Sequence, residues 1–181
     1  MKRNVVLTLI LFLSAICVRA QLNCTFTHYT QENGLSQNTI MDMIQDSDGL
    51  IWFATWNGIN RFDGYEFRVY KAHKDNESQW SSNRVDKLDM DSHGNVWCLS
   101  YDGRAFRFDK RQEAFHEIKL KGDIDFFADR IYTLDNSSVW LLSPETGAVR
   151  VTGDSATFEN YGKVNHVFLD SRQHEWVLTD D

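Results

Sequence analysis

The sequence predicts an all-β fold, and three observations lead to this prediction. Aromatic residues make up 13% of the 181 residues and are spread along the chain, as expected for many short strands with large cross-strand side chains. Hydrophobic residues make up 42% and proline occurs once, so the composition is that of a folded domain with a buried core. A tryptophan-marked segment recurs four times, which indicates four similar units of structure.

Each recurring segment consists of an apolar run, an aspartate, a polar turn and a tryptophan. The tryptophans follow one another at intervals of 45, 43 and 36 residues, and the aspartates keep nearly the same intervals. The repeat markers are Asp46, Gly49, Trp52, Asp91, Gly94, Trp97, Asp135, Trp140, Asp170 and Trp176. A period of about 40–45 residues with one tryptophan per unit is typical of propeller blades. The sequence therefore predicts a β-propeller of four-stranded antiparallel blades.

Residues 1–20 are predicted to be a secretory signal peptide. Two basic residues precede an apolar run from Val5 to Val18, and small residues stand where signal peptidase cleaves, which makes Gln21 the expected first residue of the exported protein. The run is shorter than the ~20 residues of a membrane-spanning helix. An uncleaved N-terminal anchor is the alternative. A lipoprotein is disfavoured, because neither nearby cysteine follows a small residue.

Removal of the signal peptide leaves 16 basic residues against 26 acidic ones, a net charge of −10. Nucleic-acid binding needs a basic surface, so we expect no direct nucleic-acid binding by this chain. Export would permit a disulfide between Cys24 and Cys98. Cys98 lies in an apolar strand, however, and a small buried hydrophobic residue is the favoured interpretation.

The first blade is expected at about residues 38–70. Its four predicted strands span residues 39–45, 50–55, 59–62 and 65–70. A tight Asp-x-x-Gly turn follows the first strand, and Asn57-Gly58 forms the next hairpin, because both residue types tolerate positive φ. The last strand alternates apolar and polar side chains, as a strand with one buried face does.

The second blade, about 83–118, repeats the turn and places a hairpin at Asp102-Gly103. The third, about 130–161, has lost the turn glycine and one residue before its tryptophan. A fourth blade begins over residues 164–181, where the sequence stops at the expected position of a hairpin.

The segment from Phe26 to Tyr29 resembles the last strand of the first blade. We expect it to be a closing strand that completes the final blade and so removes an open sheet edge. Residues 21–181 are therefore predicted to be an incomplete propeller, with about three and a half blades plus this N-terminal strand. A closed four-bladed ring is the alternative.

The segments 34–38, 46–55 and 57–64 resemble the two-component-regulator propeller repeat, most strongly in the first two blades. This resemblance implies the periplasmic sensor region of a Bacteroidetes hybrid two-component system, anchored in the inner membrane and homodimeric at full length. It also implies that an oligosaccharide is the ligand, and that the parent protein is a histidine kinase that regulates transcription of the genes that use the sugar. The kinase is absent from this chain.

We predict no catalysis, cofactor or metal for the chain itself. It contains no Gly-rich phosphate loop and no nucleophile elbow. The six histidines lack metal-ligand spacing, and the Asp-x-Asp-Gly turn lacks the remaining ligands of a calcium loop. Two alternative functions stay open: a secreted propeller enzyme acting on polysaccharide, and a scaffold for protein–protein interaction.

Two tryptophans do not mark the repeat, and they lie in predicted loops that share one face of a propeller. Sugars stack their apolar face on aromatic rings, while their hydroxyls bond charged or amide groups. The candidate ligand-binding residues are Trp56, Asn57, Arg61, Trp80, Tyr101, Asp102 and Arg104. The marker tryptophans are expected to pack between neighbouring blades instead.

Overall fold

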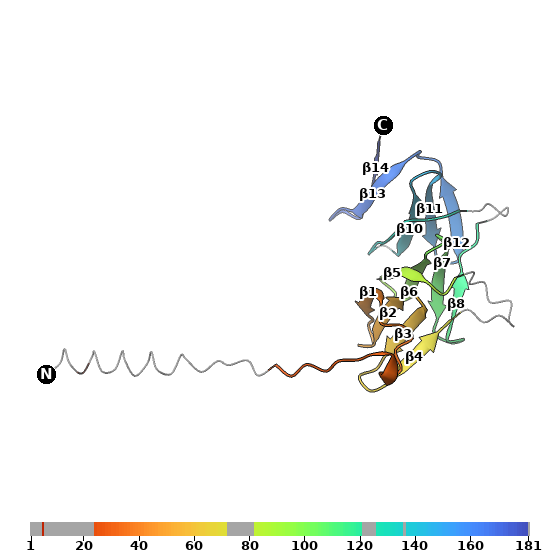
Figure 1. The fold of residues 1–181 in the computed structure, drawn as a ribbon. Helices are drawn as coiled ribbons and strands as arrows, with labels where there is room; N and C mark the ends of the chain where they lie inside the picture. Colours follow the sequence, from red (N-terminus) through yellow and green to blue (C-terminus); the bar gives the residue numbers. More distant parts are fainter. Residues whose placement is uncertain (1–4, 6–23, 72–81, 121–125, 136, 181) are drawn as a thin grey trace.

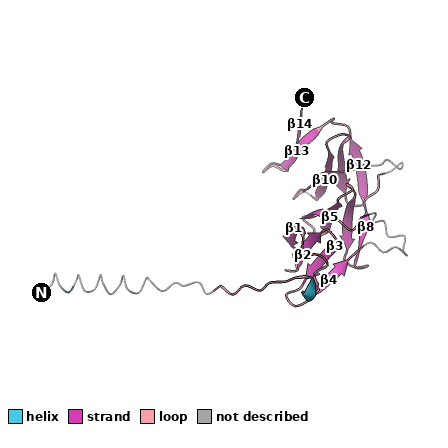
Figure 2. Ribbon diagram, in the orientation of Figure 1, coloured by secondary structure: helices cyan, strands magenta, loops and turns pink. Residues whose placement is uncertain are grey.

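The computed structural model describes residues 5, 24–71, 82–120, 126–135 and 137–180, which form a row of antiparallel sheets (Figures 1 and 2). Trp80 and nearly all of the predicted signal peptide lie outside the described residues. Among the residues described, no helix has both the length and the apolar character that crossing a membrane requires.

Three sheets have four strands each, and a fourth sheet has two, all joined in chain order. The first sheet contains β1 (Ile40–Gln45), β2 (Ile51–Thr55), β3 (Gly58–Phe62) and β4 (Phe67–Tyr70). The second contains β5 (Val85–Met90), β6 (Val96–Ser100), β7 (Ala105–Asp109) and β8 (Ala114–Glu117). The third contains β9 (Arg130–Thr133), β10 (Ser138–Ser143), β11 (Gly147–Thr152) and β12 (Ser155–Glu159). The fourth contains β13 (Val164–Leu169) and β14 (Glu175–Thr179).

The sheets follow one another in space with their first strands on one side and their fourth strands on the other (Figure 1). The first strands β1, β5 and β9 are in contact in succession, and β13 contacts β10. This arrangement, with consecutive hairpins forming each sheet, confirms the prediction of an all-β fold of four-stranded antiparallel sheets. In the first sheet, each strand begins within two residues of its predicted start.

The hydrophobic core lies between sheets, and the marker tryptophans are at its centre. Trp52 is 1% exposed and contacts Phe108 of the second sheet, with ring centroids 4.8 Å apart. Trp97 and Trp140 are buried in the same way in the next two clusters. Trp176 was expected to be buried too, but it is 54% exposed, because no further described sheet covers β14.

A hydrogen bond between the marker aspartate and the marker tryptophan explains their regular spacing. One oxygen of Asp46 accepts the backbone N–H groups of Asp48 and Leu50, while the other accepts the indole Nε1–H of Trp52 at 2.8 Å. The corresponding bonds join Asp91 to Trp97 and Asp170 to Trp176. The carboxylate therefore fastens both the turn and the core side chain.

The third sheet departs from this arrangement, and the expectation that Asp135 is a repeat marker is wrong. Asp135 is exposed, and the neighbouring Leu134 occupies the turn position that Asp46 has in the first sheet. The aspartate is one residue too close to Trp140 in sequence. The Nε1–H of Trp140 is buried and has no hydrogen-bond partner among the residues described.

The marker aspartate of the second sheet makes stability depend on pH. Burial raises the pKa of Asp91, but hydrogen bonds from Asn95, Trp97 and the backbone outweigh burial and hold the pKa below 3.8. A carboxyl whose pKa is lowered by folding stabilises the protein above its unfolded pKa, about 3.9, and this contribution is lost as the pH falls through the folded pKa.

We therefore expect the free energy of unfolding of the unmodified chain to fall more steeply below about pH 4 than that of the Asp91→Asn variant, which cannot titrate there. Urea unfolding at a series of pH values measures both slopes. Parallel slopes would show that Asp91 titrates alike in the folded and unfolded chain.

A buried polar network attaches the segment before β1 to the first sheet. The backbone N–H of Ser36 donates to Oδ1 of Asn60 at 2.8 Å, and Nδ2 of Asn60 donates to the Ser36 hydroxyl at 2.7 Å. The hydroxyls of Ser36 and Thr55 are 3.0 Å apart. Ser36 thus attaches the segment before β1 to both β2 and β3. This attachment explains why a serine lies in the segment that resembles the family repeat.

The expected closing strand at Phe26 to Tyr29 is not a strand, and this segment pairs with none of the described strands. Tyr29 instead packs edge-on against Phe62, with centroids 4.8 Å apart, while Phe26 is exposed. A strand requires a neighbouring sheet edge, and the edge of β14 lies at the opposite end of the row from this segment (Figure 1).

The two cysteines of the expected exported chain are free thiols, one exposed and one buried. Cys98 belongs to the core cluster between the first and second sheets, which agrees with its interpretation as a small hydrophobic residue. Burial raises the pKa of the Cys98 thiol well above its ordinary value. Its reactivity toward oxidants is correspondingly low.

Candidate ligand-binding face

Arg61 belongs to the repeated structure and lies away from the other candidates. It is the cross-strand partner of Trp52, near the end of β3 that is remote from the β2–β3 hairpin. Its guanidinium lies 5.6 Å from the centroid of the Trp52 ring and reaches Glu113 of the second sheet at 3.4 Å. Equivalent arginines cover the next two marker tryptophans and pair with carboxylates of the following sheets: Arg107 with Asp154, and Arg150 with Glu175.

The remaining described candidates gather at the opposite end of the strands, on the hairpins of the first two sheets. Trp56 is 50% exposed at the β2–β3 hairpin, and Tyr101 is 62% exposed at the β6–β7 hairpin. The indole Nε1–H of Trp56 donates to the sulfur of Met41 at 2.9 Å. Two aromatic rings from successive sheets therefore stand in solvent on one face.

The segment before β5 holds the two hairpins together through backbone hydrogen bonds. The N–H of Gly58 donates to the carbonyl of Asn83 at 2.7 Å, and the N–H of Tyr101 donates to the carbonyl of Arg84 at 2.9 Å. Gly58 has a φ of 108°, and a Cβ at this position would lie 2.4 Å from the carbonyl oxygen of Tyr70. The close approach requires glycine, which makes the hairpin geometry specific.

Arg84 lies between the two exposed rings, and sequence reasoning missed it. Its guanidinium carbon is 5.2 Å from the centroid of Trp56 and 4.0 Å from that of Tyr101. Its Nε donates to Asp86 at 2.9 Å, and its side chain is 33% exposed. We call Trp56, Arg84 and Tyr101 the arginine–aromatic cluster. In the sequence, the one sign of its role is that an arginine directly precedes the first strand of the second repeat, where the other repeats have different residues.

The other polar candidates are held by neighbouring groups. Asn57 donates its backbone N–H to the Thr55 hydroxyl at 3.0 Å. The Ser100 hydroxyl donates to Asp102 at 2.5 Å. Arg104 donates from Nη1 to Glu117 at 2.6 Å, and its Nε lies 3.8 Å from Asp102. Arg104 is therefore fixed beside two carboxylates at the edge of the same face.

A pocket of about 170 Å³ opens beside the β6–β7 hairpin, between the second and third sheets. Its wall combines charged side chains with rings, including Arg104, Glu117, Lys119, Phe126 and Phe127. Drug-sized ligands occupy pockets of about 300–1,000 Å³, so this one accommodates a single ring or substituent. It extends the cluster along the face toward the third sheet.

A metal site is not formed by the described part of the chain, where no group of three or more His, Cys, Asp or Glu side chains is close enough to hold an ion. Asp46, the first residue of the turn considered for calcium, uses both oxygens to accept N–H groups. The turn geometry accounts for the aspartate fully.

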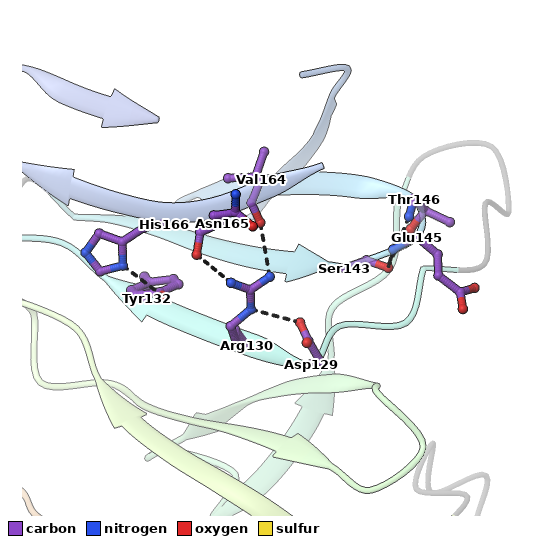
Figure 3. Close-up of polar contacts among 9 residues, drawn as sticks. All are labelled: Asp129, Arg130, Tyr132, Ser143, Glu145, Thr146, Val164, Asn165 and His166. Carbon is purple, nitrogen blue, oxygen red and sulfur yellow. Dashed lines mark hydrogen bonds and ion pairs between the residues drawn. The ribbon is translucent and has the colours of Figure 1, made fainter. Parts of the chain in front are cut away.

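Polar side chains on the first strands serve as joints between sheets. Arg130 of β9 donates to the backbone carbonyls of Val164 and Asn165 and also reaches Asp129 (Figure 3). Tyr132 and His166 bond across the same joint, 3.1 Å apart. Earlier joints use carboxylates instead: Asp42 accepts the N–H of Leu88, and Asp89 accepts the N–H of Thr133.

Comparison with known proteins identifies the repeat. A family model described as two component regulator propeller matches residues 34–57, a span that includes β1, β2, Trp56 and Asn57. Residues 34–57 are similar to the two-component-regulator propeller repeat. The matched residues include Ser36 of the buried network, the Asp46 turn and the exposed Trp56. The suspected family resemblance is confirmed.

Parts of larger regulatory proteins are also similar to this chain. Histidine kinase P4 of Formosa agariphila is 38% identical over 82 residues, which are 44% of this chain and 6% of the kinase. A solved extracellular domain assigned to a hybrid two-component system of B. thetaiotaomicron superposes with a TM-score of 0.57 at 20% identity, covering 78% of this chain and 22% of that one. Another, assigned to a one-component system of the same organism, gives 0.62 at 18% identity, covering 81% and 20%.

The chain thus spans about a fifth of the solved domains that it matches, and a smaller part of the kinase. At these identities the solved structures establish a shared fold, and they confirm the propeller architecture predicted for the row of sheets.

Proposed function

We propose that this chain is part of the exported, ligand-sensing propeller region of a hybrid two-component sensor, and that an oligosaccharide binds on the face around Trp56 and Tyr101. The observation that carries the proposal is the pair of half-exposed rings on consecutive hairpins, fixed by backbone bonds to Asn83 and Arg84. Rings held rigidly in solvent suit stacking against the apolar face of a sugar.

The chain's relatives support the signalling part of the proposal. The family model, the similar histidine kinase and the similar extracellular domains all belong to two-component or related regulatory systems. In our proposal the full-length protein is an inner-membrane homodimer, and a ligand that binds one conformation of its periplasmic region better shifts the equilibrium across the membrane. Phosphotransfer and transcriptional control would lie in other parts of that protein. This chain would contribute binding without catalysis, cofactor or direct contact with nucleic acid.

The test is calorimetric titration of the purified chain with oligosaccharides released from plant and algal polysaccharides. Trp56→Ala and Tyr101→Ala are each expected to weaken a detected affinity about three- to tenfold, because a stacking contact contributes about 0.5–1.5 kcal/mol. Tyr65→Ala is the matched control. Tyr65 is 93% exposed at the β3–β4 turn, which lies at the other end of the strands from the hairpins.

Unchanged affinity in both hairpin variants would place the sugar elsewhere. Absence of binding to every oligosaccharide would contradict the sensing function itself. Chromatography of the titrated sugars adds a third outcome, since shortened products would favour a secreted enzyme.

A further inference from the structure

We propose that Arg84 binds an anionic group on the ligand, so that the arginine–aromatic cluster selects acidic oligosaccharides over neutral ones. This inference rests on the proposed function and adds the chemical class of its ligand. The shared chemistry is an oxyanion on a sugar ring, either the carboxylate of a uronic acid or a sulfate ester.

The guanidinium of Arg84 has unused donors that point to this role. The only side-chain hydrogen bond that it makes within the described residues is from Nε to Asp86, at 2.9 Å, so both terminal nitrogens are without a partner there. The ring centroids of Trp56 and Tyr101 lie 5.2 and 4.0 Å from the guanidinium carbon, and the side chain is 33% exposed. The two terminal nitrogens of a guanidinium match the two oxygens of a carboxylate or sulfate.

The backbone around Arg84 is fixed before any ligand arrives. Its N–H donates to the Ser82 hydroxyl at 3.1 Å, and its carbonyl accepts the N–H of Tyr101. The adjacent carbonyl of Asn83 accepts the N–H of Gly58. Two backbone hydrogen bonds of Arg84, one of its neighbour Asn83 and the two adjacent rings already order this part of the chain. Binding an anion there therefore costs little conformational entropy.

Comparison among the four sheets shows that the propeller does not require an arginine at this position. The turns that follow the first strands begin at Asp46, Asp91, Leu134 and Asp170, and Arg84 precedes its turn by seven residues. The equivalent residues in the other sheets are Thr39, Phe127 and Lys163. The arginines opposite the marker tryptophans behave differently: Arg61, Arg107 and Arg150 recur, and each is paired with a carboxylate of the next sheet. Arg84 is thus an addition to the repeat, and it is placed where two hairpins expose their rings.

The charge of the whole chain does not supply the attraction. The exported chain, with 16 basic and 26 acidic residues, has a net charge of −10, so an acidic sugar is repelled at long range and must be held by direct contact. Within the face, Arg104 is already positioned between Asp102 and Glu117. Lys119 lines the neighbouring pocket, whereas Arg84 lies between the two exposed rings, so a single substitution at Arg84 tests its own part in binding an anion.

The experiment is calorimetry on the purified full chain with three probes: trigalacturonate, the same trisaccharide with its carboxyl groups reduced, and a sulfated galactose trisaccharide. We expect at least one acidic probe to bind about 10- to 100-fold more tightly than the neutral one, the range that a charge-assisted bidentate contact provides. Which acidic probe binds more tightly identifies the source of the oxyanion. In Arg84→Gln this preference should disappear while the affinity for the neutral probe is retained.

Arg172→Gln is the matched control, because it removes one exposed positive charge from the β13–β14 turn, away from the face. Arg84→Lys keeps the charge without the fork and should restore only part of the preference. Equal binding of acidic and neutral probes would overturn this inference and leave the proposed function intact, as would an equal loss for all probes in Arg84→Gln. If neither acidic probe binds the unmodified chain, this inference fails, whereas the proposed function fails only if the wider panel of oligosaccharides also shows no binding.

Discussion

Replacing Trp52 with alanine is expected to lower the free energy of unfolding by about 3–5 kcal/mol, the usual cost of removing a buried aromatic side chain. Trp52 is 1% exposed and touches both sheets that it joins, with Tyr70 on one side and Phe108 and Phe115 on the other. Its removal leaves a cavity in the joint as well as losing buried area. Because domains are typically stable by only about 5–15 kcal/mol, the variant should be close to unfolding. Urea denaturation followed by far-ultraviolet circular dichroism measures the effect independently of tryptophan fluorescence.

Trp176→Ala provides the comparison within the same repeat position. This ring is 54% exposed and, among the described residues, stacks only on Phe168, with centroids 6.3 Å apart. We expect a loss of about 1 kcal/mol, since much of the side chain already faces water. If the two substitutions cost the same, burial between sheets is not the reason for the recurring tryptophan.

Replacing Asp46 with alanine is expected to cost about 2–4 kcal/mol. The substitution leaves three N–H donors without their acceptor: the backbone groups of Asp48 and Leu50 and the buried indole of Trp52. A buried donor without a partner costs about 1–3 kcal/mol, while the two backbone groups lie in a turn that water can reach in part. The same denaturation measurement applies.

Asp135→Ala is the control for this effect, and it should change stability by no more than about 0.5 kcal/mol. Asp135 is exposed, and Trp140 does not bond to it. Asp46→Asn should fall between the two, because the amide keeps one carbonyl acceptor. A large loss in Asp135→Ala would mean that the third sheet uses its aspartate in a way that the structure does not show.

Much of the fold could be predicted from the sequence because the spacing within the repeat is set by one hydrogen bond, from the marker tryptophan to the marker aspartate. The carboxylate of Asp46 must reach the indole of Trp52 across the turn, and this requirement sets the interval of six residues that recurs in the first, second and fourth sheets. The turn glycine sets the end of β1 in a similarly local way, whereas the alternation predicted for the last strand is wrong, because Val69 is exposed and Tyr70 packs on the core. Each of these signals depends on neighbours within one hairpin.

The errors have non-local causes. Aligning the aspartates placed Asp135 at the marker position, although a one-residue deletion moves Leu134 into that place in three dimensions. The similarity of Phe26–Tyr29 to an outer strand said nothing about whether a sheet edge lies beside it. Pairing between distant segments is decided by the assembled row of sheets.

The candidate site could be predicted in part for the same reason. Because hairpins alternate ends in an up-and-down sheet, Trp56 and Tyr101 could be assigned to one face, where the structure brings them together around Arg84. Arg84 itself could not be found, since its two ring contacts come from different hairpins. Arg61 was included although it is the fourth residue of β3 and lies near the end of the strand that is remote from the hairpin, and Trp80 lies outside the described residues.

The joints between first strands have an evolutionary consequence. Asp42, Asp89 and Arg130 each reach across to backbone atoms of the following sheet rather than to its side chains. Every amino acid presents the same carbonyl, and every one except proline presents the same N–H, so the receiving strand can change most of its residues without losing the bond. Such a joint constrains the residue that supplies the side chain, but not the residues of the strand that receives it. A blade can therefore be duplicated, exchanged or allowed to diverge while its neighbours stay attached, which is how a chain can retain its architecture after its third copy has lost the turn glycine and the aspartate–tryptophan bond.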